Sequence, residues 1–520
     1  MNLNRRQVIS GIAALAAGRT VCGLSGLRPV LASVSPAELA TQLAADPRRP
    51  QYHLLPAANW MNDPNGPIYW QGQYHMFYQY NPNGAYWGDM HWGHATSPDM
   101  VHWRHLPVAL APTPGGPDAG GCFSGTALSD GSGRVAMLYT GVVPAPEDHA
   151  TIRDGVHSLR ESQCLAFGTG ASLTGWSKDS TPVIADPPPG LDVAGFRDPA
   201  PWKHGDEWLM AVGSGIRGKG GAVLLYRSHD LRHWEYLHLL AGGSGSGDKT
   251  PNPVDSGDMW ECPDFFALGD KHVLIHSTQG KAYWQSGSFD TDALVFHPER
   301  GGVLDFGSFY APKTQLDHEQ NRILWGWIPE TRPEAEYRAA GWAGLMSLPR
   351  VLTLDSSGEL RIQVAAQAGK LRQSERKLKL TGQEEEDRRR LPELQLENAC
   401  GEVACSLRRG AEPCEVSLFS DQDKDKALLT CRYDPSRPGV ILIDDKAVPV
   451  GDAGPIELRF FIDGSVIETF ANSAGALTSR FYLSGSTAAP IGVKIAAGWK
   501  SLSALSVWQI SPISRDRLTT

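Results

Sequence analysis

The chain has 520 residues, of which 41% are hydrophobic and 20% are charged. This length is enough for more than one domain, and the composition is that of an ordinary soluble protein. The net charge of −9 and the isoelectric point near 6.0 argue against a nucleic acid or an anionic membrane as partner.

The N-terminus carries the pattern of an export signal. Asn4-Arg5-Arg6-Gln7 resembles a twin-arginine motif, the run Val8–Ala17 is mildly apolar, and Val30-Leu31-Ala32 offers small residues for cleavage. The apolar run is shorter than the ~20 residues that a membrane span needs, and Arg19 follows closely. We therefore expect residues 1–32 to be a leader, and the mature protein to be periplasmic or extracellular with no membrane span.

A polar approach segment follows over residues 33–49, and one short helix is expected at Ser35–Ala45. Residues 50–350 are rich in Trp, Gly and Pro, and short strand-like runs alternate there with turn residues. The stretch Ser347–Leu352 is interpreted as the exit from this region. The composition predicts an all-β domain over residues 50–350.

Three acidic residues of this domain stand beside prolines, in NWMNDPNG (Asp63), FRDP (Asp198) and WECPD (Glu261). Proline cannot donate to a strand ladder, so it belongs on edge strands or at strand ends. It also pushes the preceding residue towards extended backbone, and Asn65-Gly66 favours a turn. We therefore expect Asp63 to end a strand and to stand at a rim, as a working carboxylate would.

The spacing of such motifs is roughly regular along the chain. Asp198 comes 135 residues after Asp63, and Glu261 comes 63 residues after Asp198. Cys122–Thr126 and Phe309–Pro312 extend the series to five motifs. A five-bladed β-propeller would produce this rhythm, because the innermost strand of each blade is an edge strand that faces a central channel.

A weak internal repeat supports the same interpretation. Ser97–Trp103 (SPDMVHW) matches Ser228–Trp234 (SHDLRHW) at its Ser, Asp, His and Trp positions. Self-similarity of this kind is typical of repeat architectures.

The C-terminal part has a different pattern. Residues 351–390 are expected to hold a linker and the first elements of a second domain, with the charged stretch Arg372–Arg390 as a solvated connection. Residues 391–520 predict a β-sandwich, because regularly spaced strands alternate with turn signals. Asp463-Gly464 indicates a hairpin between two of them. The expected strands are Glu415–Phe419, Val440–Ile443, Ile456–Ile462, Val466–Phe470 and Leu502–Trp508.

Seven cysteines follow the leader, an odd number. In an oxidising compartment Cys400, Cys405, Cys414 and Cys431 would form two disulfides, and buried thiols are an equally good interpretation. Cys262 is interpreted as a small buried neighbour of Glu261, since no obvious base accompanies it. No metal site is predicted: there is no Cys-x-x-Cys motif, and His91, His94 and His102 are expected to pack or to form hydrogen bonds.

At these motifs the chain resembles glycoside hydrolase family 32, the invertase, levanase and inulinase group of β-fructosidases. The resemblance rests on Trp60–Gly66, Phe77–Pro82, Trp92–Ala95, Phe123–Gly125, Phe196–Pro199 and Trp260–Pro263, in this order. It implies a five-bladed β-propeller catalytic domain followed by a C-terminal β-sandwich. It also implies retaining hydrolysis of terminal β-fructosyl units of fructans or sucrose, without a cofactor.

The resemblance assigns roles to the three acids. Asp63 is the expected nucleophile, Glu261 the general acid/base and Asp198 the transition-state stabiliser, with the first two carboxyl groups ~5 to 5.5 Å apart, as retention requires. The charge of Asp63 and partial desolvation beside Trp260 favour a protonated Glu261. Expected sugar contacts are Asn62, Gln79, Trp87, Phe123, Ser124, Arg197, Tyr310 and Trp327; Trp325, on the same strand face, is the alternative to Trp327.

Several functional alternatives stay open at this point. A fructosyltransferase on the same scaffold would differ in loop residues, and a non-catalytic sugar-binding propeller would have lost an acid, whereas all three are present. The sequence leaves open the choice among sucrose, levan and inulin, and also exo or endo action and the oligomeric state. Loops such as Gly115–Gly121 and Gly242–Asp258 would read what lies beyond the terminal fructose.

Overall fold

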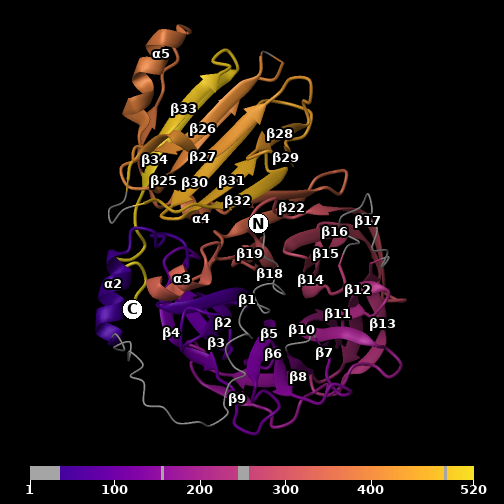
Figure 1. Cartoon of the computed structure of the whole chain (residues 1–520). Helices are drawn as coiled ribbons and strands as arrows, with labels where there is room; N and C mark the ends of the chain where they lie inside the picture. Colours follow the sequence, from indigo (N-terminus) through magenta and orange to yellow (C-terminus); the bar gives the residue numbers. More distant parts are fainter. Residues whose placement is uncertain (1–34, 154–156, 244–256, 411, 485–488) are drawn as a thin grey trace.

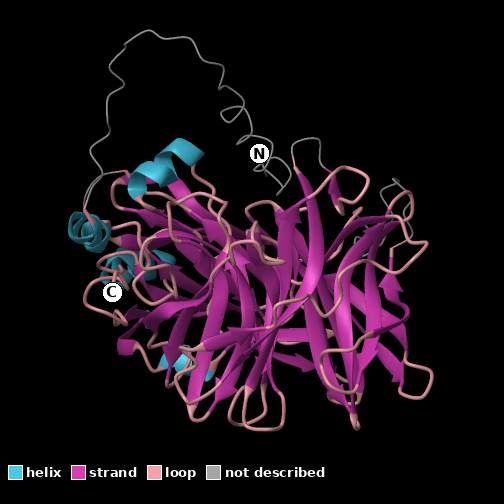
Figure 2. Ribbon diagram, turned by 90° about the horizontal axis from the view of Figure 1, so that it is seen from below, coloured by secondary structure: helices cyan, strands magenta, loops and turns pink. Residues whose placement is uncertain are grey.

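The computed structural model describes residues 35–153, 157–243, 257–410, 412–484 and 489–520. The predicted leader, residues 1–32, lies outside these ranges. The fold is all-β, and its few helices are short and lie at the margins of a body made of strands (Figure 2). Within the described ranges, no helix combines the length and the apolar character that crossing a membrane takes. The helices are α2 (Pro36–Ala45), α3 (Glu334–Ala340), α4 (Ala366–Gly369), α5 (Glu384–Arg390) and the 3₁₀ helix η3 (Leu391–Leu394).

The short N-terminal helix forms where it was predicted. Ser35 caps α2, since its hydroxyl accepts from the backbone N–H of Glu38 and the Glu38 carboxylate accepts in return from the backbone N–H of Ser35. Pro36 occupies the first turn, where its missing N–H costs nothing.

Residues 59–364 form five mainly antiparallel sheets, each built largely from strands that follow one another in the chain. The first contains β1 (Asn59–Trp70), β2 (Gln73–Asn81), β3 (His91–Ser97), β4 (Arg104–Leu110) and β20 (Trp342–Ala343). The second contains β5 (Gly121–Ser129), β6 (Val135–Pro144), β7 (Ile152–Arg153), β8 (Ser158–Gly168) and β9 (Trp176–Lys178). The third contains β10 (Val193–His204), β11 (Glu207–Ile216), β12 (Gly220–Ser228) and β13 (Glu235–Gly242).

The fourth sheet contains β14 (Glu261–Leu268), β15 (Lys271–Thr278), β16 (Lys281–Asp290) and β17 (Val295–Val303). The fifth contains β18 (Tyr310–Leu316), β19 (Arg322–Ile328), β21 (Leu345–Met346), β22 (Arg350–Leu354) and β23 (Leu360–Val364). Strand β22 pairs with β19, and β23 pairs with β22, so this sheet continues to Val364, whereas we expected the region to end at about residue 350.

The five sheets are arranged around a common centre (Figure 1). Their first strands β1, β5, β10, β14 and β18 contact one another in turn, and β18 contacts β1. Each pair of neighbouring sheets shares a hydrophobic cluster, including the last and the first. A short parallel pairing of β20 with β1, Asn59 opposite Trp342, joins the end of this region to its beginning.

Each of the five first strands has an irregular register at its motif. The shifts fall between Met61 and Pro64, Phe123 and Gly125, Arg197 and Ala200, Glu261 and Asp264, and Tyr310 and Lys313. A bulge leaves backbone groups outside the ladder, and prolines 64, 199, 263 and 312 are tolerated there for that reason. The five recurring motifs of the sequence are therefore five bulges.

This arrangement corrects two local predictions. Asp63 does not end a strand at a rim: it lies inside β1 and is fully buried. Asn65-Gly66 is not a turn but the start of a second irregularity in β1, between Asn65 and Ile68. Gly66 is required there because its φ is +51° and an added Cβ would lie 2.0 Å from the backbone nitrogen of Ala127 in β5.

The internal repeat is confirmed as one turn built twice, between β3 and β4 and between β12 and β13. In the first copy Asp99 accepts from the backbone N–H of His102, and the Trp103 indole donates to the carbonyl of Met100. In the second copy Asp230, His233, Trp234 and Leu231 repeat these contacts. The third residue of each turn has a positive φ, +67° at Met100 and +66° at Leu231.

The C-terminal part consists of two sheets that share one hydrophobic core. One sheet contains β24 (Arg372–Lys377), β34 (Leu502–Ile510), β25 (Cys400–Leu407), β30 (Ile456–Asp463), β31 (Val466–Ala471) and β32 (Gly475–Arg480). The other contains β29 (Lys446–Pro449), β28 (Val440–Ile443), β27 (Asp423–Tyr433), β26 (Cys414–Ser420) and β33 (Ile491–Ala497). All five strands predicted here are confirmed, and so is the hairpin, where Asp463 pairs with Val466.

The charged stretch Arg372–Arg390 was wrongly predicted as a connection. Its start is β24, which pairs with β34 at the edge of a sheet, and its end is helix α5. Charged residues suit an edge strand because they discourage further pairing, and the helix is supported by an i,i+4 ion pair between Glu384 and Arg388.

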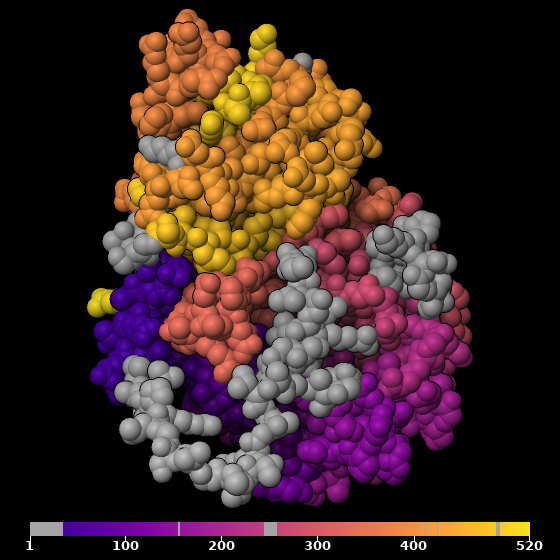
Figure 3. Space-filling view, in the orientation of Figure 1, coloured from indigo at the N-terminus to yellow at the C-terminus, as the bar shows by residue number. Residues whose placement is uncertain are grey.

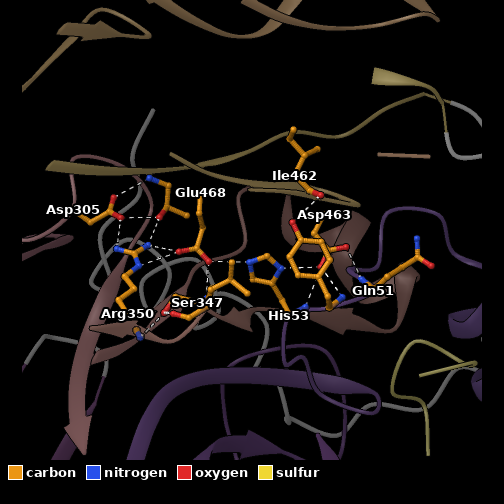
Figure 4. Close-up of polar contacts among 12 residues, drawn as sticks. Gln51, His53, Asp305, Ser347, Arg350, Ile462, Asp463 and Glu468 are labelled. Atoms are coloured by element: carbon orange, nitrogen blue, oxygen red, sulfur yellow. Dashed lines mark hydrogen bonds and ion pairs between the residues drawn. The ribbon is translucent and has the colours of Figure 1, made fainter. Parts of the chain in front are cut away.

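The C-terminal lobe sits on the five-sheet body (Figure 3), and a buried polar network joins the two. His53 lies between Asp463 and Glu468, at 2.8 and 2.9 Å, and Arg350 lies between Glu468 and Asp305 (Figure 4). All five side chains are fully buried. Burial of charges is tolerated here because each carboxylate also accepts backbone N–H groups.

The seven cysteines of the described ranges are buried thiols, so the thiol interpretation holds for Cys400, Cys405, Cys414 and Cys431. The histidines behave as predicted. His94 stacks on Phe77 and contacts His75, while His91 and His102 form hydrogen bonds with carbonyl and carboxylate oxygens.

Candidate active site

Asp63 lies at the bulge of β1 and accepts hydrogen bonds on both carboxylate oxygens. One carboxylate oxygen accepts from the hydroxyl of Ser124 at 2.7 Å and the other from the amide of Asn62 at 2.9 Å. The Asn62 amide oxygen accepts in turn from the indole of Trp60 at 2.7 Å. These hydrogen bonds fix the orientation of the Asp63 carboxylate.

Asp198 occupies the equivalent bulge of β10 with a φ of +65°. Its backbone N–H donates to the hydroxyl of Thr140, and its carboxylate accepts from the backbone N–H of Cys262 at 2.8 Å. Cys262 and Ala311, which also precede prolines at bulges, share the left-handed conformation at +50° and +51°. A positive φ in three residues that are not glycine is a strain concentrated at this site.

The thiol of Cys262 connects the two buried aspartates. Its sulfur lies 3.5 Å from Asp63 and 3.4 Å from Asp198. Burial, reinforced by the charges of Asp198 and Asp63, raises the pKa of Cys262 well above its ordinary value. Cys262 is therefore a neutral spacer and weak donor between two carboxylates, in agreement with its interpretation as a small neighbour and not a nucleophile.

Glu261 begins β14 and receives donors on both carboxylate oxygens. The Tyr310 hydroxyl donates to one oxygen at 2.5 Å, and Arg197 donates to the other at 2.9 and 3.2 Å. Behind it, the Trp260 ring stacks on His276 with 3.9 Å between centroids. Glu261 thus combines a buried aromatic support with two polar partners from the neighbouring strands β10 and β18.

A cavity of about 360 Å³ opens over Glu261, within the usual range of small-molecule sites. Glu261 is the one of the three acids that lines it; Asp63 and Asp198 lie next to Cys262, one residue further along the chain. Its walls are mixed aromatic and basic. The lining includes Trp87, Phe123, Arg153, His157, Arg197, Arg217, Asp258 and Tyr310.

The predicted sugar contacts divide into three groups. Trp87, Phe123, Arg197 and Tyr310 line the cavity, and Asn62 and Ser124 hold Asp63. Trp327 packs against Trp60 and Tyr310, whereas Trp325 is buried against Trp103. Gln79 does not reach the cavity lining, and its amide donates to the carbonyl of Cys122 at 2.9 Å.

The residues of the site that sequence reasoning missed include Thr140 and Glu161, and the cavity residues Arg153, His157 and Arg217. Glu161 is the most consequential, because it is fully buried and ion-pairs with Arg197 at 2.8 Å. Its one signal was a charged residue in the middle of β8, a strand that pairs on both sides. Charged residues are almost never fully buried unless they are paired.

Comparisons with known proteins agree with this geometry. The model of the "Glycosyl hydrolases family 32 N-terminal domain" matches residues 53–364, and that of "Glycosyl hydrolases family 32 C terminal" matches residues 367–509. A sucrose-6-phosphate hydrolase of Escherichia coli is 36% identical over 462 residues, which cover 83% of this chain and 89% of that protein. A raffinose invertase of the same species is 35% identical, with coverage of 83% and 89%.

Among solved structures, fructan 1-exohydrolase IIa from Cichorium intybus superposes with a TM-score of 0.73 and 28% identity. The match covers 90% of this chain and 98% of that one. A variant of the same enzyme has been solved in complex with 1-kestose.

Proposed function

The chain belongs to glycosyl hydrolase family 32 and is a glycoside hydrolase, and from that premise we propose an exported retaining β-fructosidase. It removes terminal β-D-fructofuranosyl units from sucrose and from fructans such as levan and inulin. In this proposal the five sheets are the blades of a five-bladed β-propeller, and the two C-terminal sheets form a β-sandwich. The proposed catalytic domain runs from residue 50 to Val364, where β23 ends, and the proposed sandwich includes β24 in addition to residues 391–520.

One observation carries the proposal: three of the five bulged strands bring their carboxylates to Cys262 or to the residue beside it, next to a cavity. In the first step the Asp63 carboxylate attacks the anomeric carbon of fructose, and the bond to the leaving oxygen breaks. Glu261 gives that oxygen its proton. In the second step Glu261 takes a proton from water, and the hydroxide oxygen displaces Asp63.

The remaining polar groups support this chemistry. Asp198, held by the backbone of Cys262, binds ring hydroxyls and stabilises the positive charge that develops on the sugar. Asn62 and Ser124 orient the nucleophile by their hydrogen bonds. Trp87 and Phe123 present aromatic surface to the apolar face of the sugar, and their rings lie 5.8 Å apart.

Replacement of either reacting carboxylate tests the proposal. We expect Asp63→Ala and Glu261→Ala to lower kcat for sucrose at least ~1,000-fold, because each removes a group that forms or breaks a covalent bond to the substrate or to its proton. Fructose release is measured with circular dichroism as the check of folding. Near-normal hydrolysis by either variant would refute the assigned roles, and early inversion at the anomeric carbon, seen by NMR, would refute the covalent step.

Substrate and location are tested separately. Initial rates on sucrose, sucrose 6-phosphate, raffinose, levan and inulin rank the natural substrates, and chain-length analysis of the products separates exo from endo action. Product analysis at high sucrose measures fructosyl transfer.

For export, cell fractionation of the full chain is compared with the Arg5→Lys/Arg6→Lys variant, which is expected to keep the activity in the cytoplasm.

A further inference from the structure

Glu161 is a buried carboxylate that is not one of the three acids. It contacts Phe196 and Arg197, the two residues that precede Asp198 in the chain. One of its oxygens accepts from the backbone N–H of Phe196 at 2.7 Å and from the hydroxyl of Thr151 at 2.9 Å. The other accepts from Arg197 at 2.8 Å. A polar group that is removed from water needs such partners, and these donors compensate the burial of Glu161.

Arg197 is shared between this carboxylate and Glu261. Its Nη1 faces Glu161, while its Nε and Nη2 face Glu261. Gly195 leaves the space for this position, because an added Cβ would lie 2.6 Å from Nη1. Burial lowers the pKa of Arg197, but the charges of Glu161, Glu261 and Asp198 raise it well above its ordinary value, so the guanidinium stays charged.

The shared arginine creates a difficulty for the first chemical step. Glu261 must hold a proton there, yet Arg197 and Tyr310 both donate to it and so favour its ionised form. Asp63 and Asp198 contact the neutral thiol of the next residue, Cys262, and the charge of Lys313 of β18 also acts on that thiol. Arg153, His157, Arg217 and Asp258 line the cavity above. Whether Glu261 holds its proton therefore depends on how strongly the positive charge of Arg197 acts on it.

We infer that Glu161 is a positioning residue that orients Arg197 and neutralises part of its charge, so that Glu261 keeps its proton at the working pH. The inference rests on the proposed function of Glu261 as general acid. Glu161 itself touches neither substrate nor reacting atoms and acts through the arginine. This gives the site two buried glutamates on one guanidinium: Glu161, which holds the arginine, and Glu261, which exchanges its proton in the proposed reaction.

Glu161→Gln is the direct test, since it removes the charge and keeps the shape. With Arg197 no longer neutralised, Glu261 loses its proton more readily, and the alkaline limb of the kcat/KM profile for sucrose moves about one pH unit towards acid. At pH values above the alkaline limbs of both wild type and variant, kcat/KM of the variant is about tenfold lower than that of wild type. At pH values below these two limbs, the variant approaches wild type. A fructosyl donor with a nitrophenolate leaving group needs little protonation, so its hydrolysis is affected less.

Two further variants guard against a purely structural effect. Glu161→Asp keeps the charge and should hold the alkaline limb within a few tenths of a unit of wild type. Glu402→Gln removes a carboxylate in β25 that is equally buried and pairs with Arg372 and Arg459, far from the site. It should lower the melting temperature and leave the profile in place.

The outcomes separate the inference from the function on which it rests. A shift in Glu161→Gln alone supports the inference. An active wild type combined with an unmoved limb in Glu161→Gln, or with the same shift in Glu161→Asp and Glu402→Gln, overturns the inference and leaves the proposed function intact. A wild type that releases no fructose from any β-fructoside overturns both.

Discussion

At the scale of single residues, the site is a set of shared donors. Cys262 lies between Asp63 and Asp198, and Arg197 lies between Glu161 and Glu261. Because each donor serves two carboxylates, the charge state of one acid depends on its neighbour, and the titration belongs to the group as a whole.

Tyr310 offers a test in the direction opposite to that of Glu161. Its hydroxyl favours the ionised form of Glu261, so in Tyr310→Phe the proton is retained to higher pH and the alkaline limb moves up by about half a unit to one unit. We also expect about a tenfold loss in kcat, because the base of the second step loses a partner. The measurement is the pH dependence of kcat/KM and kcat for sucrose.

The control is Tyr226→Phe, which removes a buried hydroxyl from β12 without a partner in the described structure. It should leave both limbs unchanged. A limb that moves to lower pH in Tyr310→Phe would show that the hydroxyl does not act on the ionised form.

Sequence reasoning reached the acids because short motifs mark them, and it missed Glu161 because no motif does. Glu161 is recognisable once β8 is known to pair on both sides and Arg197 is known to need a counterion. Gln79 was expected at the sugar for its place in a family motif, but its amide is engaged with the backbone of Cys122. The position of a residue in a motif predicts that it lies near the site, but it does not predict where its side chain points.

At the scale of elements, the bulge is the unit that builds the site. Prolines indicated an edge or a strand end, whereas the structure uses them inside strands where the register slips. A sequence propensity describes one chain segment, whereas a register shift is a property of two paired strands. The pattern therefore predicted that the prolines avoid the regular ladder, but it did not predict that they stand at bulges inside strands. The same limit hid β24, which is a strand because β34 is beside it.

Gly66 tests how closely two of the sheets must approach. Gly66→Ala adds a Cβ that would overlap the backbone of Ala127, in addition to the cost of a positive φ. We expect the free energy of unfolding to fall by about 2 to 4 kcal/mol, as measured by chemical denaturation.

Gly72 is the matched control, because its φ is +84° but nothing lies within 4 Å of an added Cβ. Gly72→Ala should therefore cost only the conformational part, about 1 kcal/mol. Equal losses in the two variants would mean that the contact between β1 and β5 relaxes without cost.

At the scale of the whole molecule, the network around His53 joins the two lobes and makes their union depend on pH. Burial by itself lowers the pKa of His53, but hydrogen bonds to Asp463 and Glu468 and the charges of both raise it to about 9. The folded value thus exceeds the ~6.5 of an unfolded chain. The stabilisation is complete below about pH 6.5 and is lost as pH rises through 9.

We expect this contribution to be about 3 kcal/mol, and to be visible as a fall in the melting temperature between pH 6.5 and 9. His53→Gln should start from a lower melting temperature and show a flatter profile over that interval. His102→Gln, which removes an exposed histidine paired with Asp99, should keep the slope of wild type. Parallel profiles for wild type and His53→Gln would contradict the assignment.

The two-lobe architecture and most C-terminal strands could be predicted, because alternating hydrophobic residues reveal which face of a strand is buried. The buried polar network that joins the two lobes could not be predicted. His53, Arg350 and the hairpin that carries Asp463 and Glu468 are distant in the sequence, and each of these residues has the appearance of a surface residue in its own context. Only the packed structure shows that their charges are sealed between the lobes.

The parallel pairing of β20 with β1 also sets an order of events during synthesis. Trp342 follows Asp63 by 279 residues, so at ~5–20 residues per second the ribosome needs tens of seconds to deliver the strand that completes the β1 edge. Until the last sheet emerges, Asn59 and Trp60 at the start of β1 lack these parallel partners. Slow elongation in between would prolong the interval in which the start of β1 can pair wrongly.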